Sequence, residues 1–300
     1  MKGGNKQEVR VSIRSILVPV DGAHDNQAIL ENALELARTF NAHVDALHVR
    51  IDPRDSVPLF GEGLSGDMVE EMVTSADRES NAKADALRTL FEDLCKTRNV
   101  PQVAGPGGGE DAITATWREK VGREDEVVAW RGRLADLVVT ARPDADASPM
   151  RALTLHATLF ECGRPVLALP TDPKVAEIGR VVAIAWNGTA QAARAVHAAM
   201  PIITRAYEVN VLTCESERTQ PTAADELAEY LGWWGVTPKV IGFPPGDQSI
   251  GQAILDQAYD VNADMLVTGA YSHSRLMQTV LGGVTSAMMD VAAIPVFFSH

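Results

Sequence analysis

Short apolar runs alternate with amphipathic stretches along the whole chain, and this alternation predicts strands that are each followed by a helix. The first run covers 16–20 and ends in Asp21-Gly22, a pair typical of a turn. The next stretch, Asn26–Phe40, carries apolar residues at helical spacing. Further along we expect strands over 42–49, 113–117, 135–140 and 165–170, and helices over 68–97, 124–134 and 150–162.

The same order of elements begins again after a polar linker at 171–179. The run 182–188 has the shape of 16–22, and 263–268 repeats 135–140 almost letter for letter. An internal duplication therefore predicts a first domain over 12–170 and a second over 179–300. In the second half we expect helices over 190–200, 222–234 and 249–261, and strands over 182–188, 209–213, 239–243, 263–268 and 295–298.

Alternating strands and helices favour an α/β fold in which a parallel sheet is covered by helices on both faces. In such sheets, ligands lie beyond the carboxyl ends of the strands, where the strand order reverses. Asp21 and Asn187 each follow the first strand of a half, and the loops after Thr140 and Thr268 follow the fourth. The pair Trp233-Trp234 ends a helix, and we expect it to pack in the core.

The amino-acid composition of the chain argues against several classes of function. A net charge of −13 over 300 residues argues against a nucleic-acid footprint and against binding to anionic membranes. The three cysteines, Cys95, Cys162 and Cys214, are far apart, so neither a disulfide framework nor a thiolate metal site is indicated. The polar start of the chain lacks a signal-peptide core, and no apolar run is long enough to span a membrane. We expect a cytoplasmic protein.

The strongest candidate site is a loop rich in small residues that begins at Gly269 and ends at Gly282-Gly283, ahead of a predicted helix. Such a corner exposes backbone N–H groups, which suit a phosphate. Ser272, Ser274 and Thr285 offer hydroxyl groups, and Arg275 offers a positive charge. The alternative interpretation is that the glycines serve only turns and helix–strand packing.

This loop resembles the nucleotide motif of the universal stress protein family, which reads Gly, two residues, Gly, nine residues, Gly, then Ser or Thr. Gly269 and Gly282 stand at the first and third positions, while Ser272 and Gly283 replace the second Gly and the Ser or Thr. Asp21-Gly22 after the first strand resembles the opening of the family. The whole chain looks like a tandem member, which implies two Rossmann-like five-stranded domains.

The resemblance implies that an adenine nucleotide, ATP or AMP, binds the second half, with Mg2+ as a possible companion. Asn187 would lie on the adenosine side, although its amide cannot supply charge to a metal ion. The nucleotide-binding residues implied for this chain are Ala185, Trp186, Asn187, Gly188, Thr268, Gly269, Ser272, Ser274, Arg275, Gly282, Gly283, Val284 and Thr285.

The first half differs at the corresponding loop. Pro143 and Pro149 each remove an N–H donor, and Asp144 and Asp146 would repel phosphate. We therefore expect one competent site per chain, in the second half. Asp21 stands without a second acidic residue at ligand spacing, which favours a turn cap over a metal ligand.

The resemblance implies a stress-response sensor or regulator. We expect no rapid catalysis, because no residue is placed to activate water. The halves would pair as an internal pseudo-dimer through their last strands, Val166–Leu169 and Val296–Ser299, and the resemblance also allows a homodimer. Two alternatives stay open. One is a nucleotide-free interaction module in which the motif is structural. The other is a small-ligand hydrolase or adenylating enzyme of the same sheet type.

Overall fold

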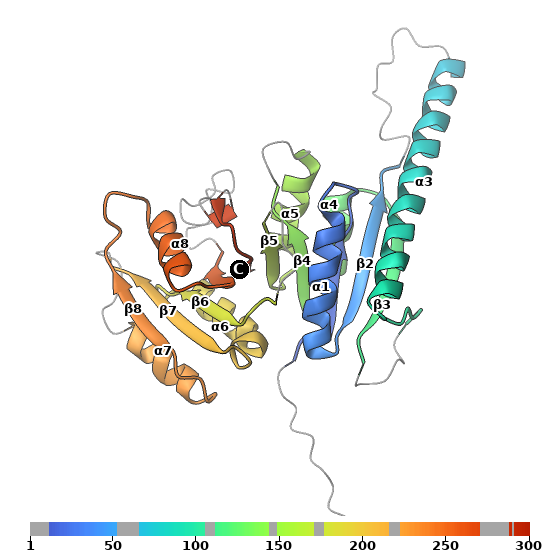
Figure 1. The fold of residues 1–300 in the computed structure, drawn as a ribbon. Coiled ribbons are helices and arrows are strands. Elements are labelled where there is room, and N and C mark those ends of the chain that lie inside the picture. The colour runs from blue at the N-terminus through green and yellow to red at the C-terminus, as the bar shows by residue number, and fades with distance from the viewer. Residues whose placement is uncertain are drawn as a thin grey trace, which may run out of the picture.

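The computed structural model describes residues 12–52, 66–105, 112–143, 149–170, 177–215, 223–270, 288–289 and 291–300. Ten strands form one sheet in the order β3-β2-β1-β4-β5-β10-β9-β6-β7-β8, with helices on both sides (Figure 1). The fold is therefore α/β, as the alternation of apolar runs and helical stretches predicts.

The first half supplies one side of this sheet. Its strands are all parallel and follow the order β3-β2-β1-β4-β5, which reverses between β1 and β4. The elements are β1 (Ser15–Pro19), α1 (Asn26–Phe40), β2 (His43–Arg50), α3 (Gly66–Thr97), β3 (Thr114–Val121), α4 (Glu124–Gly132), β4 (Leu137–Ala141), α5 (Pro149–Glu161) and β5 (Val166–Leu169).

The second half repeats the arrangement, since β8-β7-β6-β9-β10 is the same order with its reversal between β6 and β9. Its elements are β6 (Val181–Ala185), α6 (Ala190–Ile203), β7 (Glu208–Cys214), α7 (Ala223–Gly232), β8 (Lys239–Phe243), α8 (Ile250–Asp260), β9 (Met265–Gly269) and β10 (Val296–Ser299). The fold class of two five-stranded Rossmann-like units is confirmed, while the boundaries 12–170 and 179–300 stay a prediction.

One aspartate in each half shows how closely the units match. The Asp136 carboxylate accepts the backbone N–H groups of Arg14 and Ser15 at the start of β1, at 2.8 and 3.0 Å. Asp264 does the same at the start of β6, where it accepts from Arg180 and Val181 at 3.0 and 2.9 Å. Each aspartate precedes the fourth strand of its half. The two halves therefore share not only their strand order but also these individual hydrogen bonds.

The two halves meet along β5 and β10, the one antiparallel pair among the described strands. Leu167 lies opposite Phe297, and Val166 lies opposite Phe298. Each of these strands would be an exposed edge in an isolated half. Their pairing satisfies the backbone groups of both edges and makes ten strands continuous.

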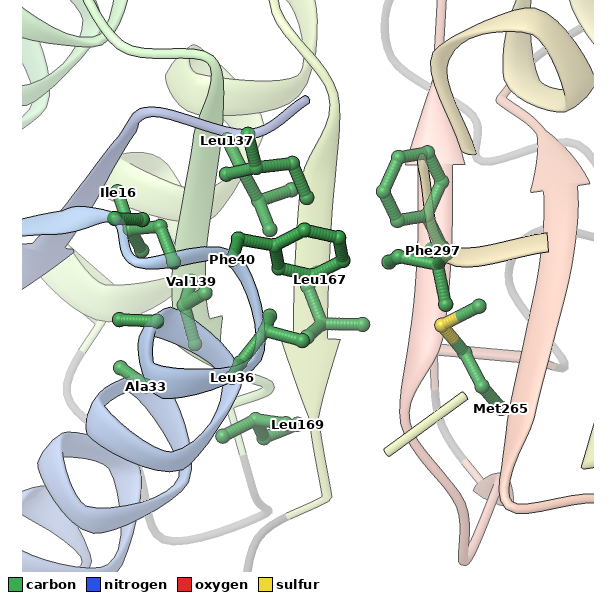
Figure 2. Packing of buried hydrophobic residues seen from close by; sticks show 14 of the residues in the cluster. Ile16, Ala33, Leu36, Phe40, Leu137, Val139, Leu167, Leu169, Met265 and Phe297 are labelled. Atoms are coloured by element: carbon green, nitrogen blue, oxygen red, sulfur yellow. The ribbon is translucent and has the colours of Figure 1, made fainter. Parts of the chain in front are cut away.

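Apolar side chains of each strand alternate between the two faces of the sheet, as parallel strands buried on both sides require. One face packs under α1, α3, α6 and α7, and the other under α4, α5 and α8. Figure 2 shows the cluster of the first of these faces at the joint, where Leu167 of β5 faces Phe297 of β10, with Phe40 beside Leu167 and Met265 below Phe297. The core thus runs through the joint without a break.

Three local expectations need correction. Trp233 and Trp234 are not in the core, because they follow the end of α7 and leave the face that buries Leu227 and Leu231; Trp233 is 83% exposed. The helix expected over 190–200 continues through Pro201 to Ile203, since Ile202 and Ile203 are buried beside it. The strand expected to end at residue 117 runs on to Val121 along β2.

No described helix is long and apolar enough to cross a membrane.

We predict that Phe297→Ala destabilises the protein by about 3–5 kcal/mol, because a fully buried phenyl ring leaves a cavity at the joint. Urea unfolding monitored by circular dichroism measures the change. Leu153→Ala, at a side chain that is 51% exposed, is the matched control and should shift stability by less than about 1 kcal/mol. Equal losses from the two substitutions would contradict a core that extends through the joint.

Candidate functional site

The strand order reverses twice, and each reversal brings two loops together at the carboxyl ends of the strands. In the first half these loops follow β1 and β4. In the second half they follow β6 and β9, where Asn187 and Gly269 lie. The predicted site residues Ser272, Ser274, Arg275, Gly282, Gly283, Val284 and Thr285 lie outside the described residues.

In the second half, the loop after β6 leads directly into α6. The Asn187 side-chain oxygen accepts hydrogen bonds from the Thr189 N–H at 3.1 Å and from its hydroxyl at 2.8 Å. The Thr189 hydroxyl oxygen in turn accepts the Ala192 N–H at 3.3 Å and caps the helix. Asn187 is exposed, and in the described part of the chain no acceptor takes its Nδ2 hydrogens.

The residues that flank Asn187 build the turn. Ala185 is buried at the end of β6, and the Trp186 N–H donates to the Leu212 carbonyl at 2.9 Å. Gly188 has φ +73°, a conformation that favours glycine. These contacts hold Asn187 just beyond the carboxyl end of β6.

Gly269 ends β9 where this strand passes the first turn of α6. A methyl group added at Gly269 would lie 2.6 Å from the Ala192 nitrogen and 2.6 Å from the Gln191 carbonyl carbon. Only glycine allows this approach, so helix–strand packing accounts for Gly269 without any ligand. Thr268 beside it is buried, and its hydroxyl donates to the Gly269 carbonyl at 3.3 Å. The same packing brings the start of the glycine-rich loop against the amino end of α6.

The corresponding place in the first half is filled by an ion-pair network. The Arg151 guanidinium, in the first turn of α5, donates to Asp21 at 2.8 and 3.3 Å and to Asp25 at 2.8 and 2.6 Å. Arg151 is 8% exposed and Asp25 is 4% exposed. A cation in the first turn of a helix is unfavourable by itself, and the two carboxylates offset this.

Asp21 is a turn cap, as its sequence context indicates, because its carboxylate accepts the Ala23 N–H at 3.0 Å and the Asn26 amide at 2.7 Å. Burial alone would raise the pKa of Asp21. The Arg151 charge and these hydrogen bonds outweigh burial and leave the pKa below its usual value. The same carboxylates raise the pKa of Arg151 against the opposing effect of burial.

Two further groups surround this network. The Lys83 side chain lies over Gly22, where a methyl group would overlap it. Glu124, at the start of α4, accepts the Thr154 hydroxyl at 3.1 Å. Burial, with the Asp21 charge, raises the pKa of Glu124 to about 6. The first half therefore contains five charged side chains at its own reversal of strand order.

Sequence reasoning did not find the roles of Asp25 and Arg151. In the sequence, Asp25 is one polar residue ahead of a predicted helix. Arg151 lies 126 residues further along the chain, so nothing local links the two. The usable signal was an arginine in the first turn of a predicted helix, which is an unfavourable position without an anionic partner. Among the described residues, no group of three or more His, Cys, Asp or Glu could hold a metal ion.

The family model of the universal stress proteins matches residues 12–146. This segment is a little under half of the chain, and over it the chain is similar to the universal stress protein family. Its match falls on the first half, where the reversal of strand order is filled by Arg151. The glycine-rich loop that resembles the nucleotide motif of the family is in the other half.

Solved structures similar to this chain include a universal stress protein from Archaeoglobus fulgidus DSM 4304. Its TM-score is 0.68 at 15% identity, over 95% of this chain and 97% of that one. A functionally unknown protein from Pseudomonas aeruginosa PAO1 gives a TM-score of 0.53 at 17% identity, over 96% of this chain and 92% of that one. At these identities the likeness shows the fold alone, and it extends over both halves. Among curated proteins, none matches the chain.

We predict that Gly269→Ala destabilises the protein by about 1–3 kcal/mol, because the added methyl group meets the backbone of α6. Gly232→Ala is the control, since a methyl group there has no neighbour within 4 Å. Urea unfolding of both variants measures the difference. A neutral Gly269→Ala would contradict the close approach of β9 to α6.

We predict that Glu124 makes the folded protein less stable as pH rises from about 4.5 to about 6. In that window the native Glu124 retains a proton that the unfolded chain releases, so unfolding becomes easier with rising pH. Glu124→Gln should remove this dependence and should be more stable than the wild type at pH 7, by about 1–2 kcal/mol. Asp21 acts in the opposite direction and at lower pH, because its lowered pKa stabilises the fold above 3.8.

Urea unfolding at several pH values between 4 and 7 tests this prediction. Glu126→Gln is the matched control, because its side chain is 67% exposed on the same helix. Parallel stability curves for Glu124→Gln and the wild type across this range would contradict the assignment.

Proposed function

We propose that this chain binds an adenine nucleotide, ATP or AMP, where β6 and β9 end in the second half. The supporting observation is the juxtaposition of the amino end of α6, the exposed Asn187 amide and the first glycine of the loop. A helix amino end attracts phosphate through its N–H groups and its dipole. The N–H groups of Ala190 and Gln191 have no acceptor in the described part of the chain.

The Asn187 side chain suits the nucleoside in this proposal. Its oxygen is occupied by Thr189, so its Nδ2 group is left to donate to a ribose or base oxygen or nitrogen. The family pattern then assigns the phosphates to Gly269, Ser272 and the segment 282–285. An amide cannot replace a carboxylate as a metal ligand of full charge, so any Mg2+ would rest mainly on phosphate oxygens.

The contrast between the halves supports one site per chain. In the first half, Arg151 and its two carboxylates occupy the reversal of strand order, and Lys83 lies over the adjoining turn. We further infer that the halves form an internal pseudo-dimer in which the first half supports the second. The antiparallel pairing of β5 with β10 favours this arrangement.

We infer that the nucleotide acts as a signal in a stress response and that any hydrolysis is slow. The described groups at this edge are an amide, hydroxyls and backbone N–H groups, which are poor general bases at neutral pH. A sensor of this kind would report nucleotide levels through a change in its shape or partners.

A nucleotide-free interaction module is the second candidate, and two observations favour it. The packing of Gly269 against α6 explains this glycine without a ligand. The amino-terminal part of α3 extends beyond the sheet in Figure 1, where Met68 and Met72 are 50% and 43% exposed. Nucleotide titration separates the two candidates.

Isothermal titration of the full chain with ATP and with AMP tests the proposal. We expect saturable binding with a dissociation constant of roughly 1 mM or lower. Gly282→Asp should weaken it at least about tenfold, because a carboxylate beside the phosphates is repulsive. Asp21→Asn, in the first half, is the control and should leave the affinity unchanged once thermal melting confirms that it is folded.

Two results would contradict the proposal. A wild type that shows no saturable binding at millimolar nucleotide removes the sensor function. Binding that survives Gly282→Asp but is lost in Asp21→Asn places the site in the first half.

A further inference from the structure

A cavity lies where the two halves meet on the face covered by α1 and α6, at the carboxyl ends of these two helices. Its volume is about 190 Å³, somewhat more than the roughly 150 Å³ that accommodates one benzene molecule. Two of its lining residues, Arg180 and Tyr207, stand just before β6 and β7, so the cavity lies at the amino ends of these strands. The proposed nucleotide site lies beyond the carboxyl end of β6, so the two sites are separate.

The floor of the cavity is apolar and comes from both halves. Phe40, the last residue of α1, and Ile202, in the last turn of α6, are 5% and 2% exposed. Gly179 has φ +88° and passes so close to Ile202 that a methyl group added there would overlap the Ile202 side chain. Ile178, which precedes it, is half-buried against the same core. A ligand that rests on this floor must therefore have an apolar body.

Two arginines line the cavity, and each lies over an aromatic ring. The Arg205 Cζ atom, in the second half, lies 5.1 Å from the ring centre of Phe40 in the first half. The Arg180 Cζ atom lies 5.7 Å from the ring centre of Tyr207, and the Tyr207 N–H donates to the Arg180 carbonyl at 2.8 Å. A contact with a ring face restrains a guanidinium without using its N–H groups in hydrogen bonds. Both arginines are therefore held in place with donors to spare.

The carboxylates around the cavity leave these charges largely unpaired. In the described part of the chain, no carboxylate pairs with the Arg205 guanidinium, although the chain carries a net charge of −13. Arg180 has one long contact with Glu177, at 3.8 Å, and these two side chains are 62% and 76% exposed. The Asp264 carboxylate nearby is occupied by the backbone N–H groups of 179–181, at 2.7, 3.0 and 2.9 Å. The lining residues thus carry two positive charges against the single negative charge of Glu177.

We propose that this cavity binds a small organic carboxylate whose apolar body is about the size of one ring. The body rests on Phe40 and Ile202, and the carboxylate accepts N–H groups of Arg205, because a guanidinium and a carboxylate are planar groups of matching geometry. Such a ligand touches the end of α1 in one half and the end of α6 in the other. It therefore fastens the two halves together at the side of the sheet opposite the proposed nucleotide site.

Saturation-transfer difference NMR of the full chain, titrated with benzoate, tests this proposal. We expect a dissociation constant on the order of 1 mM, because the carboxyl ends of α1 and α6 disfavour an anion. Arg205→Met should weaken binding at least about fivefold, and Arg205→Lys should restore only part of it, since an ammonium group lacks the planar fork. Glu177→Gln removes the opposing charge and should strengthen binding about twofold. Arg88→Met, at an arginine on α3 that is 58% exposed, is the matched control and should leave the affinity unchanged.

Benzamide, the neutral counterpart of benzoate, should bind at least about fivefold more weakly, because it lacks the charge that the guanidinium recognises. Three results would overturn the proposal. The first is the absence of a saturable benzoate signal at concentrations about tenfold above the expected dissociation constant. The second is equal affinity of Arg205→Met and the wild type, which places benzoate elsewhere on the surface. The third is displacement of benzoate by ATP, which places it in the nucleotide site.

Discussion

The antiparallel pairing of β5 with β10 is the interaction on which the rest of the structure depends. Each half is a five-stranded sheet that ends at this edge, and an unpaired edge leaves a row of backbone donors and acceptors open. Pairing closes both edges, lets Leu167 and Phe297 share one core, and brings the loop after β4 beside the segment that precedes β10. The hydrogen bond from the Arg142 guanidinium to the Met288 carbonyl exists only because these strands are adjacent.

Most of the fold can be predicted from the sequence, because strands buried on both faces produce continuous apolar runs that end at turn residues. The errors have local causes. Pro201 suggests a helix end, yet buried neighbours carry α6 two residues further. Two adjacent tryptophans suggest a core position, but the direction of a side chain at a helix end depends on how the helix docks. The apolar character of a residue does not by itself show in which direction its side chain will point.

The candidate site was predictable only in part. The turn at Asn187 and the glycine at Gly269 are local features. The structure places them at the carboxyl ends of the adjacent strands β6 and β9. The pairing of Asp25 with Arg151 joins the amino ends of two helices that pack on opposite faces of the sheet, so no sequence window contains it. Arg142 is harder still, since its acceptors are backbone carbonyls, which leave no trace in the sequence.

Both strands of the joint belong to one polypeptide, which changes how the pairing responds to dilution. Joining two modules in one chain gives each an effective concentration of order millimolar toward the other, whatever the amount of protein. At protein concentrations well below this value, each half therefore pairs with the other in preference to a half of another chain. A side-chain contact such as that of Arg142 with the Met288 carbonyl is then needed on one side only, and the two halves are free to diverge in sequence. A symmetric pair of separate chains would have to carry every such change twice.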